Sequence, residues 1–168
     1  SPQFRSALGF FNRVDMREAL HTAGYLWRPE GGKVISFGPQ VEMLINHDRL
    51  NRIQDWNIAP QFSVEMPRRT TLLALRSESY ELFRNLGFRK HRNMVRVKSE
   101  WKRWLAFDTS FENGTNINFY PAPGVAPFLG DMTAARAGFT LRPNRQLRMD
   151  ESYLYSGLRR NGAGVFQN

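Results

Sequence analysis

The side chains that most often carry catalysis or bind metals are few in this sequence and lie far apart. His21, His47 and His91 have neither a second histidine nor a carboxylate at ligand spacing, and the chain contains no cysteine. This excludes a disulfide framework, a thiolate metal site and a cysteine nucleophile. The glycine and serine motifs of nucleotide sites and hydrolases are also missing. The sequence therefore predicts a protein that is not an enzyme and that has no catalytic residues, no metal site and no cofactor.

Charge is the chemistry that remains, because 24 Lys and Arg residues face 15 Asp and Glu residues, for a formal net charge of +9. Such an excess attracts nucleic acid, the phosphates of anionic lipid or lipopolysaccharide, or anionic solutes. Residues 90–104, KHRNMVRVKSEWKRW, interleave basic and aromatic side chains and are the best nucleic-acid candidate. A strand with one solvated basic side explains them better, so nucleic acid is not the favoured partner.

An apolar–polar alternation with a period of two must position these charges, and it is the clearest pattern in the chain. It predicts half-buried or lipid-facing strands with a polar second face. The alternation predicts eight strands, at residues 16–28, 34–46, 56–66, 70–83, 94–102, 104–113, 133–142 and 146–158. Within 70–83, Leu73 and Leu75 have one parity and Tyr80 and Leu82 the other, which suggests a β-bulge or a shift of face.

The connections between these strands alternate in expected length. Short turns are expected at 29–33, 67–69, 102–103 and 143–145, and longer loops at 47–55, 84–93 and 114–132. In an up-and-down meander every second connection lies at the same end. The pattern therefore predicts short turns at one end and long loops at the other, as in outer-membrane barrels.

Two all-β architectures fit the alternation. A soluble sandwich or small barrel would bury the apolar side, and a transmembrane barrel would expose it to lipid. Two further features favour the membrane barrel. Long charged residues crowd the polar parity, as a wet lumen tolerates; the candidates are Arg96, Lys98, Glu100, Arg136, Arg142, Arg148 and Asp150, with Arg76 on the same parity. Aromatic residues near the expected strand ends would form interface girdles; the candidates are Trp27, Trp56, Trp101, Trp104, Phe111, Tyr153 and Tyr155.

Four residues disagree with a simple lipid-facing pattern. Glu151 shares the parity of Met149 and Tyr153, and His21 shares that of its alanine neighbours, so both would point toward lipid. Pro39 and Pro60 fall inside expected strands, where each removes one hydrogen-bond donor.

Two blocks of the sequence resemble a barrel-like family of unknown function from Gram-negative bacteria. They are FRSALGFFNRVDMREALHTAGYLWRP at 4–29 and INFYPAPGVAPFLGDMTAARAGFTLRPNRQLRMDESYLYSGL at 117–158. In that family the region follows a family 9 carbohydrate-binding-like module. The resemblance extends over residues 4–160. It implies an outer-membrane β-barrel and no active-site residues, and because the family's proteins are longer, it implies that this chain is one section of a larger barrel.

Together these observations predict a single β-barrel domain, or a section of a barrel, over residues 1–168, in the cell outer membrane. The expected function is a passive pore or a component that captures solute at the surface, with a basic lumen. The expected partners are outer-membrane lipid and lipopolysaccharide, anionic or carbohydrate solutes, and other envelope proteins. Two alternatives stay open: a structural anchor or subunit of an outer-membrane complex, and a soluble basic β-domain that binds nucleic acid or another polyanion.

Overall fold

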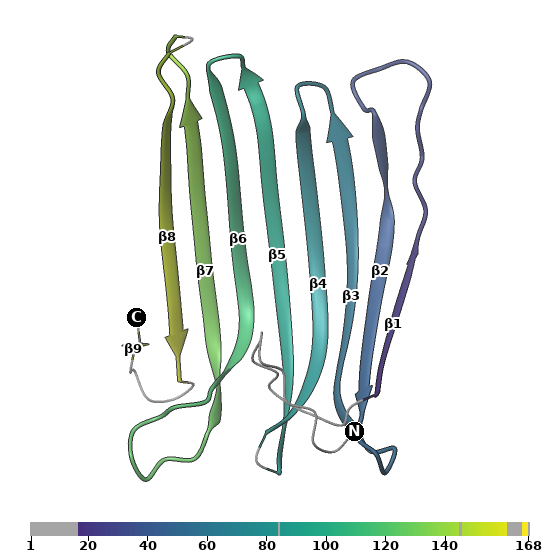
Figure 1. Ribbon diagram of the computed structural model, residues 1–168, viewed down its shortest axis with the longest axis vertical. Helices are drawn as coiled ribbons and strands as arrows, with labels where there is room; N and C mark the ends of the chain where they lie inside the picture. The colour runs from purple at the N-terminus through teal and green to yellow at the C-terminus, as the bar shows by residue number, and fades with distance from the viewer. Residues whose placement is uncertain (1–16, 84, 145, 161–165, 168) are drawn as a thin grey trace.

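The computed structural model describes residues 17–83, 85–144, 146–160 and 166–167, and these form one antiparallel sheet. The strands follow chain order across the sheet as an up-and-down meander (Figure 1). They are β1 (Arg17–Gly24), β2 (Ser36–His47), β3 (Ile53–Met66), β4 (Thr70–Phe83), β5 (Leu86–Lys102), β6 (Leu105–Asn118), β7 (Phe128–Leu141), β8 (Met149–Arg159) and the short β9 (Phe166–Gln167). The predicted all-β meander of eight long strands is confirmed. In the described ranges no helix is long and apolar enough to cross a membrane.

The sheet is open. β1 pairs with β2, and β8 pairs with β7 and β9, and no ladder among the described residues joins the first strand to the last. The structure therefore shows the expected meander without the closure that defines a barrel.

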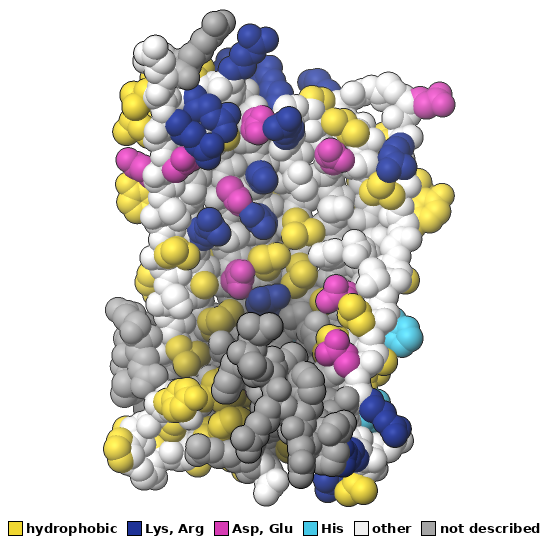
Figure 2. Space-filling model, viewed as in Figure 1, with side chains coloured by type: hydrophobic (Ala, Val, Ile, Leu, Met, Phe, Trp, Pro, Cys, Tyr) yellow, Lys and Arg dark blue, Asp and Glu magenta, His cyan; other side chains and the backbone are white. Residues whose placement is uncertain are grey.

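The register divides the side chains between two faces, because directly paired residues of antiparallel strands point to the same side. One row crosses seven strands and is almost entirely apolar: Pro39, Phe62, Ala74, Val95, Phe111, Ala135 and Tyr155. We call the side that holds this row the apolar face and the opposite side the charged face. Figure 2 shows one face of the sheet, on which basic and acidic side chains gather mainly over the upper half.

No second layer formed by the described residues covers the apolar face. Among the described residues only Ala59 and Ile117 are buried hydrophobic side chains. Phe62, Val95 and Phe111, in contrast, are 44%, 48% and 50% exposed. A continuous exposed apolar surface of this kind normally contacts a partner, since burying apolar area contributes about 25 cal/mol per Å². The described part of the sheet thus has very few buried hydrophobic side chains.

The connections do not alternate in length, so that prediction is wrong. Residues 25–35, 67–69, 103–104 and 142–148 connect strands at the upper end in Figure 1, and 48–52, 84–85 and 119–127 at the lower end. Each end has both tight turns and longer loops. Loop length therefore does not distinguish the two ends of this sheet.

The largest boundary error is at β5, which begins at Leu86 although residues 84–93 were expected to be a loop. Residues 89–93 are polar on both parities, with Arg89 and His91 on one side and Lys90 and Arg92 on the other, so hydrophobic alternation cannot reveal this part of the strand. Backbone pairing with β4 continues without interruption from Thr71↔Lys98 to Phe83↔Leu86.

Of the two expectations for residues 70–83, that register excludes the bulge and agrees with the shift of face. The ladders of β4 to both neighbours keep a constant register, so β4 has no bulge. Leu72, opposite Val64 and Val97, supplies the apolar face, whereas Leu73 and Leu75 point to the charged face. Arg76 consequently lies on the apolar face, opposite Asn93, and not with the charged candidates.

Both prolines lie within strands, opposite apolar partners: Pro39 opposite Phe62, and Pro60 opposite Val41. The β3–β4 ladder skips the positions between Ile58↔Glu78 and Gln61↔Leu75, where Pro60 has no N–H to donate. Gly38 is required by a close approach, since a Cβ there would lie 1.9 Å from the Tyr25 carbonyl oxygen. The 25–35 connection therefore folds back tightly onto the start of β2.

Candidate site on the charged face

The upper half of the charged face collects charged side chains from β5 to β8. Lys98 lies opposite Asp108, and Asp108 lies opposite Gly138. In the next row toward the lower end, Arg96 and Arg136 lie on either side of Ser110. Adjacent strands are about 4.8 Å apart, so these charges lie close together. Residues distant in sequence thus form one electrostatic cluster.

Two carboxylates of this cluster are held by arginines through paired hydrogen bonds. Arg96 donates from Nε to Asp108 Oδ1 at 2.8 Å and from Nη2 to Oδ2 at 2.5 Å. Arg148 donates to both oxygens of Asp150 at 2.7 and 3.1 Å, and the Thr140 hydroxyl donates to Oδ1 at 2.6 Å. All four charged side chains are partly exposed, so solvent screens both pairs and neither is a strong source of stability.

Three cations of the cluster have no such partner. Among the described residues, the side chains of Lys98, Arg136 and Arg142 have no carboxylate within salt-bridge distance and no hydrogen-bond acceptor. All three line one hollow of about 380 Å³. The Asp108 carboxylate also interacts electrostatically with Arg136 and Lys98, although its hydrogen bonds go to Arg96. The lining itself has four cations and four carboxylates, but Arg96 and Arg69 pair with Asp108 and Glu100 from outside it, so positive charge is in excess around the hollow.

Small residues leave space in the hollow. Ala106, Gly138 and Ser152 line it between the longer charged side chains. Gly138 lies opposite Asp108 and Ser152 and so faces the same side. A Cβ added there would be 3.3 Å from the Asp108 carbonyl oxygen, so a larger side chain would occupy the space between the cations.

Glu100 lines the same hollow, and a tight turn holds its carboxylate. Its carboxylate accepts a hydrogen bond at 3.1 Å from Arg69, in the 67–69 connection. Arg68 and Arg69 adopt positive φ angles of 62° and 48°, which are uncommon for arginine. The Glu100 N–H donates to the Arg68 carbonyl at 3.0 Å. The turn is therefore fastened to the end of β5, a contact that the sequence pattern did not indicate.

The remaining basic candidates lie outside the strands. Arg142 and Arg148 begin and end the 142–148 connection. The Arg142 N–H donates to the Trp104 carbonyl at 2.8 Å, which joins this connection to the β5–β6 turn. Both residues line the same hollow as Lys98.

The aromatic candidates fall into two groups. Trp27 precedes β2 and stacks on Phe37 with 5.5 Å between ring centroids, and Trp101 and Trp104 lie at the β5–β6 turn. Trp56 lies in β3, opposite Tyr80. Phe111, Tyr153 and Tyr155 lie within strand interiors on the apolar face.

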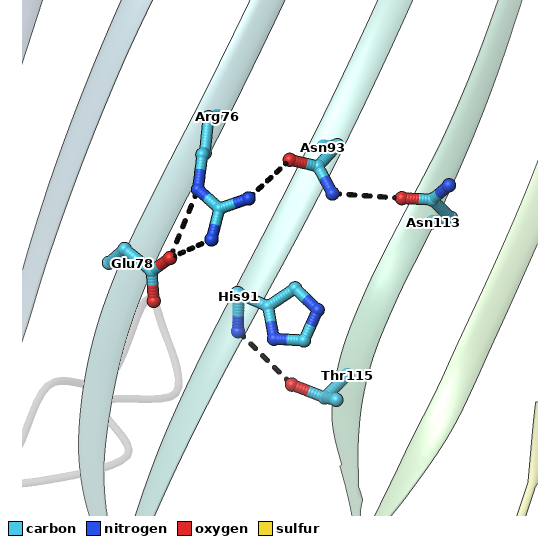
Figure 3. Close-up of polar contacts among 6 residues, drawn as sticks. All are labelled: Arg76, Glu78, His91, Asn93, Asn113 and Thr115. Atoms are coloured by element: carbon cyan, nitrogen blue, oxygen red, sulfur yellow. Dashed lines mark hydrogen bonds and ion pairs between the residues drawn. The ribbon is translucent and has the colours of Figure 1, made fainter.

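A polar relay on the apolar face was not recognised in the sequence. Arg76, on β4, donates to Asn93 Oδ1 at 3.1 Å, and Asn93 donates to Asn113 Oδ1 at 2.9 Å (Figure 3). Arg76 also forms an ion pair with Glu78. These side chains lie toward the lower end of the sheet, directly below the Ala74–Val95–Phe111 row. Their pairing across three strands requires the register, which single-sequence alternation does not provide.

Glu151 also lies on the apolar face, opposite Phe139, and accepts a hydrogen bond from the Tyr153 hydroxyl at 3.1 Å. The β7–β8 register is constant, so no bulge turns the Glu151 side chain to the charged face. It is the third residue of β8, near the upper end of that strand in Figure 1.

Comparison of the chain with protein-family models, with curated proteins and with solved structures finds no match. Residues 4–16 of the first resembling block lie outside the described residues. Across the parts of the chain that the structure describes, no group of three or more His, Asp or Glu residues could hold a metal ion.

Proposed function

We propose that the chain is an outer-membrane β-barrel, or a section of one, that allows passive passage of anionic solutes along its charged face. The observation that carries this proposal is the uncovered apolar face. A bilayer would bury that face, and on β3 it extends from Trp56 to Met66, which matches the 9–11 residues of a typical transmembrane strand.

The opposite face supports the second part of the proposal. It presents charged and small polar side chains, which a water-filled lumen tolerates. The excess of cations over carboxylates in its upper half would raise the local concentration of anions. A barrel also requires that the two edges of the sheet pair, either with each other or with further strands.

Single-cysteine labelling tests the membrane orientation without background, because the chain has no cysteine. Nitroxides would be attached at Phe111→Cys and Ser110→Cys, which are neighbours on opposite faces of β6. After reconstitution in vesicles, the label at 111 should collide preferentially with oxygen dissolved in lipid. The label at 110 should collide with a water-soluble nickel chelate. Equal access of the chelate to both sites would contradict the orientation.

Planar-bilayer recording tests passage. The reconstituted protein should conduct, and the reversal potential in a salt gradient should indicate anion preference. Alternating label accessibility without any current would instead support the structural anchor, and failure to bind vesicles would support a soluble polyanion-binding domain.

A further inference from the structure

We propose that the hollow lined by Lys98, Arg136 and Arg142 is a binding subsite for a multivalent oxyanion of a dissolved solute, a phosphate or pyrophosphate group. This deepens the proposed function and rests on it for the route by which solute arrives. The three cations are contributed by different parts of the fold: β5, β7 and the 142–148 connection.

The charge balance of the hollow identifies the ligand class. Asp108 and Asp150 are each neutralised by an arginine, and Glu100 by Arg69. Glu151 contributes to the lining, but its carboxylate lies on the apolar face with Tyr153. The uncompensated charge is therefore three cations around one space. A monovalent anion would leave most of this charge unpaired, whereas an oxyanion with two or three charges can accept hydrogen bonds from several donors at once.

The shape of the hollow supports the same class. Two guanidinium groups present flat forks of donors that match the oxygens of a phosphate. Ala106, Gly138 and Ser152 leave room between them. The volume of about 380 Å³ exceeds that of one phosphate group, so a phosphate-bearing solute or pyrophosphate also fits.

The phosphate should come from a dissolved solute and not from a lipid headgroup. Lys98 and Arg136 point to the face opposite the apolar row, away from where lipid would lie. A headgroup phosphate of a lipid on the apolar face would be on the wrong side of the sheet.

Isothermal titration with inorganic phosphate and with pyrophosphate tests the proposal on the full chain folded in detergent micelles. We expect saturable binding, tighter for pyrophosphate. Arg136→Gln, Lys98→Gln and Arg142→Gln should each weaken the binding about tenfold or more, the scale of a lost charged hydrogen bond. Arg136→Lys keeps the positive charge but loses the planar pair of guanidinium donors, and it should weaken phosphate binding less than Arg136→Gln does.

Arg89→Gln is the matched control. Arg89 is exposed, has no ion pair among the described residues, and lies on β5 opposite Tyr80, on the apolar face. Replacing Arg89 lowers the net charge by the same amount as Arg136→Gln. It should leave the affinity for phosphate within twofold of that of the unaltered protein. Equal weakening by Arg89→Gln and Arg136→Gln would overturn the subsite, because the effect would then be general electrostatics.

Gly138→Leu tests the space independently of charge. It retains all three cations and should abolish binding, while far-ultraviolet circular dichroism confirms that the sheet has formed. Unchanged binding in this variant would overturn the proposal. So would competition by phosphatidic acid vesicles that phosphatidylcholine vesicles do not show, since the site would then take a lipid phosphate.

This assay needs no current. Phosphate binding without conductance would contradict passage but not the subsite, and conductance without phosphate binding would contradict the subsite alone.

Discussion

The upper and lower halves of strands β4–β6 have opposite polarity on the same face. In the upper half the apolar face is hydrophobic, with Ala74, Val95 and Phe111 in one row. One row lower, Arg76 and Asn93 begin the polar relay, which continues to Asn113. The apolar face changes from hydrophobic to polar within two residues along each strand. We call this sharp transition the boundary.

On the charged face the side chains differ in the opposite direction, because aromatic contacts lie near its lower end. Phe83 and Phe119 contact each other edge-to-face with 4.9 Å between ring centroids. Arg160 lies over the ring of Phe128, 4.7 Å from its centroid. Aromatic contacts thus appear near this end of the charged face, although Lys90 and Arg92 on β5 still form ion pairs there with Glu81 and Glu112.

In the proposed membrane orientation, the lipid-facing stripe therefore covers only part of β4–β6. The lower parts of these strands would then extend past the bilayer into water, where a polar outward side is favourable. β3 differs, since its apolar parity continues from Trp56 to Met66. Strands of membrane barrels are tilted by about 35–45°, so a flat bilayer meets different positions on neighbouring strands.

The largest effect should come from placing a charge on either side of this boundary. Phe111→Arg and Asn113→Arg are two residues apart on β6, on the same face, and both native side chains are exposed. In vesicles, Phe111→Arg should lower the free energy of unfolding by about 2–4 kcal/mol, the cost of an arginine facing lipid near the midplane. Asn113→Arg should cost less than about 1 kcal/mol at an interfacial level. Urea titration followed by tryptophan fluorescence measures both, and equal losses would remove the boundary.

Removing hydrogen bonds of the polar relay should lower the free energy of unfolding by a smaller amount. Asn93→Ala removes the hydrogen bonds to both Arg76 and Asn113, whereas Asn113→Ala removes one. Because these groups are partly exposed, water replaces some of the lost bonding, and we expect a loss near the low end of about 0.5–1.5 kcal/mol per hydrogen bond.

A double-mutant cycle between residues 93 and 113 isolates their bond, with Ser110→Ala on the charged face of β6 as the control. A coupling energy of zero would show that the relay does not stabilise the boundary.

The smallest expected effect is local and concerns the order of the 48–52 connection at the lower end. The Asp48 carboxylate accepts hydrogen bonds from the N–H groups of Arg52 and Leu50, and from Arg52 Nε at 2.7 Å. The backbone hydrogen bond from Arg52 is the main reason that the pKa of Asp48 is below its ordinary value. A lowered pKa means that the carboxylate stabilises this loop above about pH 4 and that the contribution is lost as the pH falls further.

Titration of the carboxyl carbon by NMR should therefore give a pKa below the ordinary aspartate value, and Asp48→Asn should increase amide exchange at Leu50 and Arg52. An ordinary pKa would show that the loop is not ordered by this carboxylate.

The strands with one apolar parity could be predicted from the sequence, and β4 has the predicted bounds of 70–83. The start of β5 could not, because Arg89, Lys90 and His91 are polar on both sides and only pairing with β4 makes them a strand. For the same reason the expected 84–93 loop was too long, whereas the connection at 25–35 is longer than expected because β1 ends at Gly24.

The charged candidates on β5 and β7 could be grouped by parity alone. The identity of the unpaired cations could not, since it depends on which arginine reaches which carboxylate. Arg96 takes Asp108 and leaves Arg136 without a partner, a choice that depends on side-chain geometry across strands. Arg76 was placed on the wrong face because Leu73 and Leu75 were taken to mark the apolar side of this strand, whereas the register puts both on the charged face.

The open edges have a consequence for how such a sheet could enter a membrane. In lipid each backbone N–H or C=O without a hydrogen bond costs several kcal/mol, because no water is present to replace the lost partner. The outward-pointing backbone groups of β1 and β8 would therefore oppose insertion until both edges are paired. Edge pairing and burial of the apolar face would then occur as one concerted step, and the sheet would assemble at the membrane surface before it crosses.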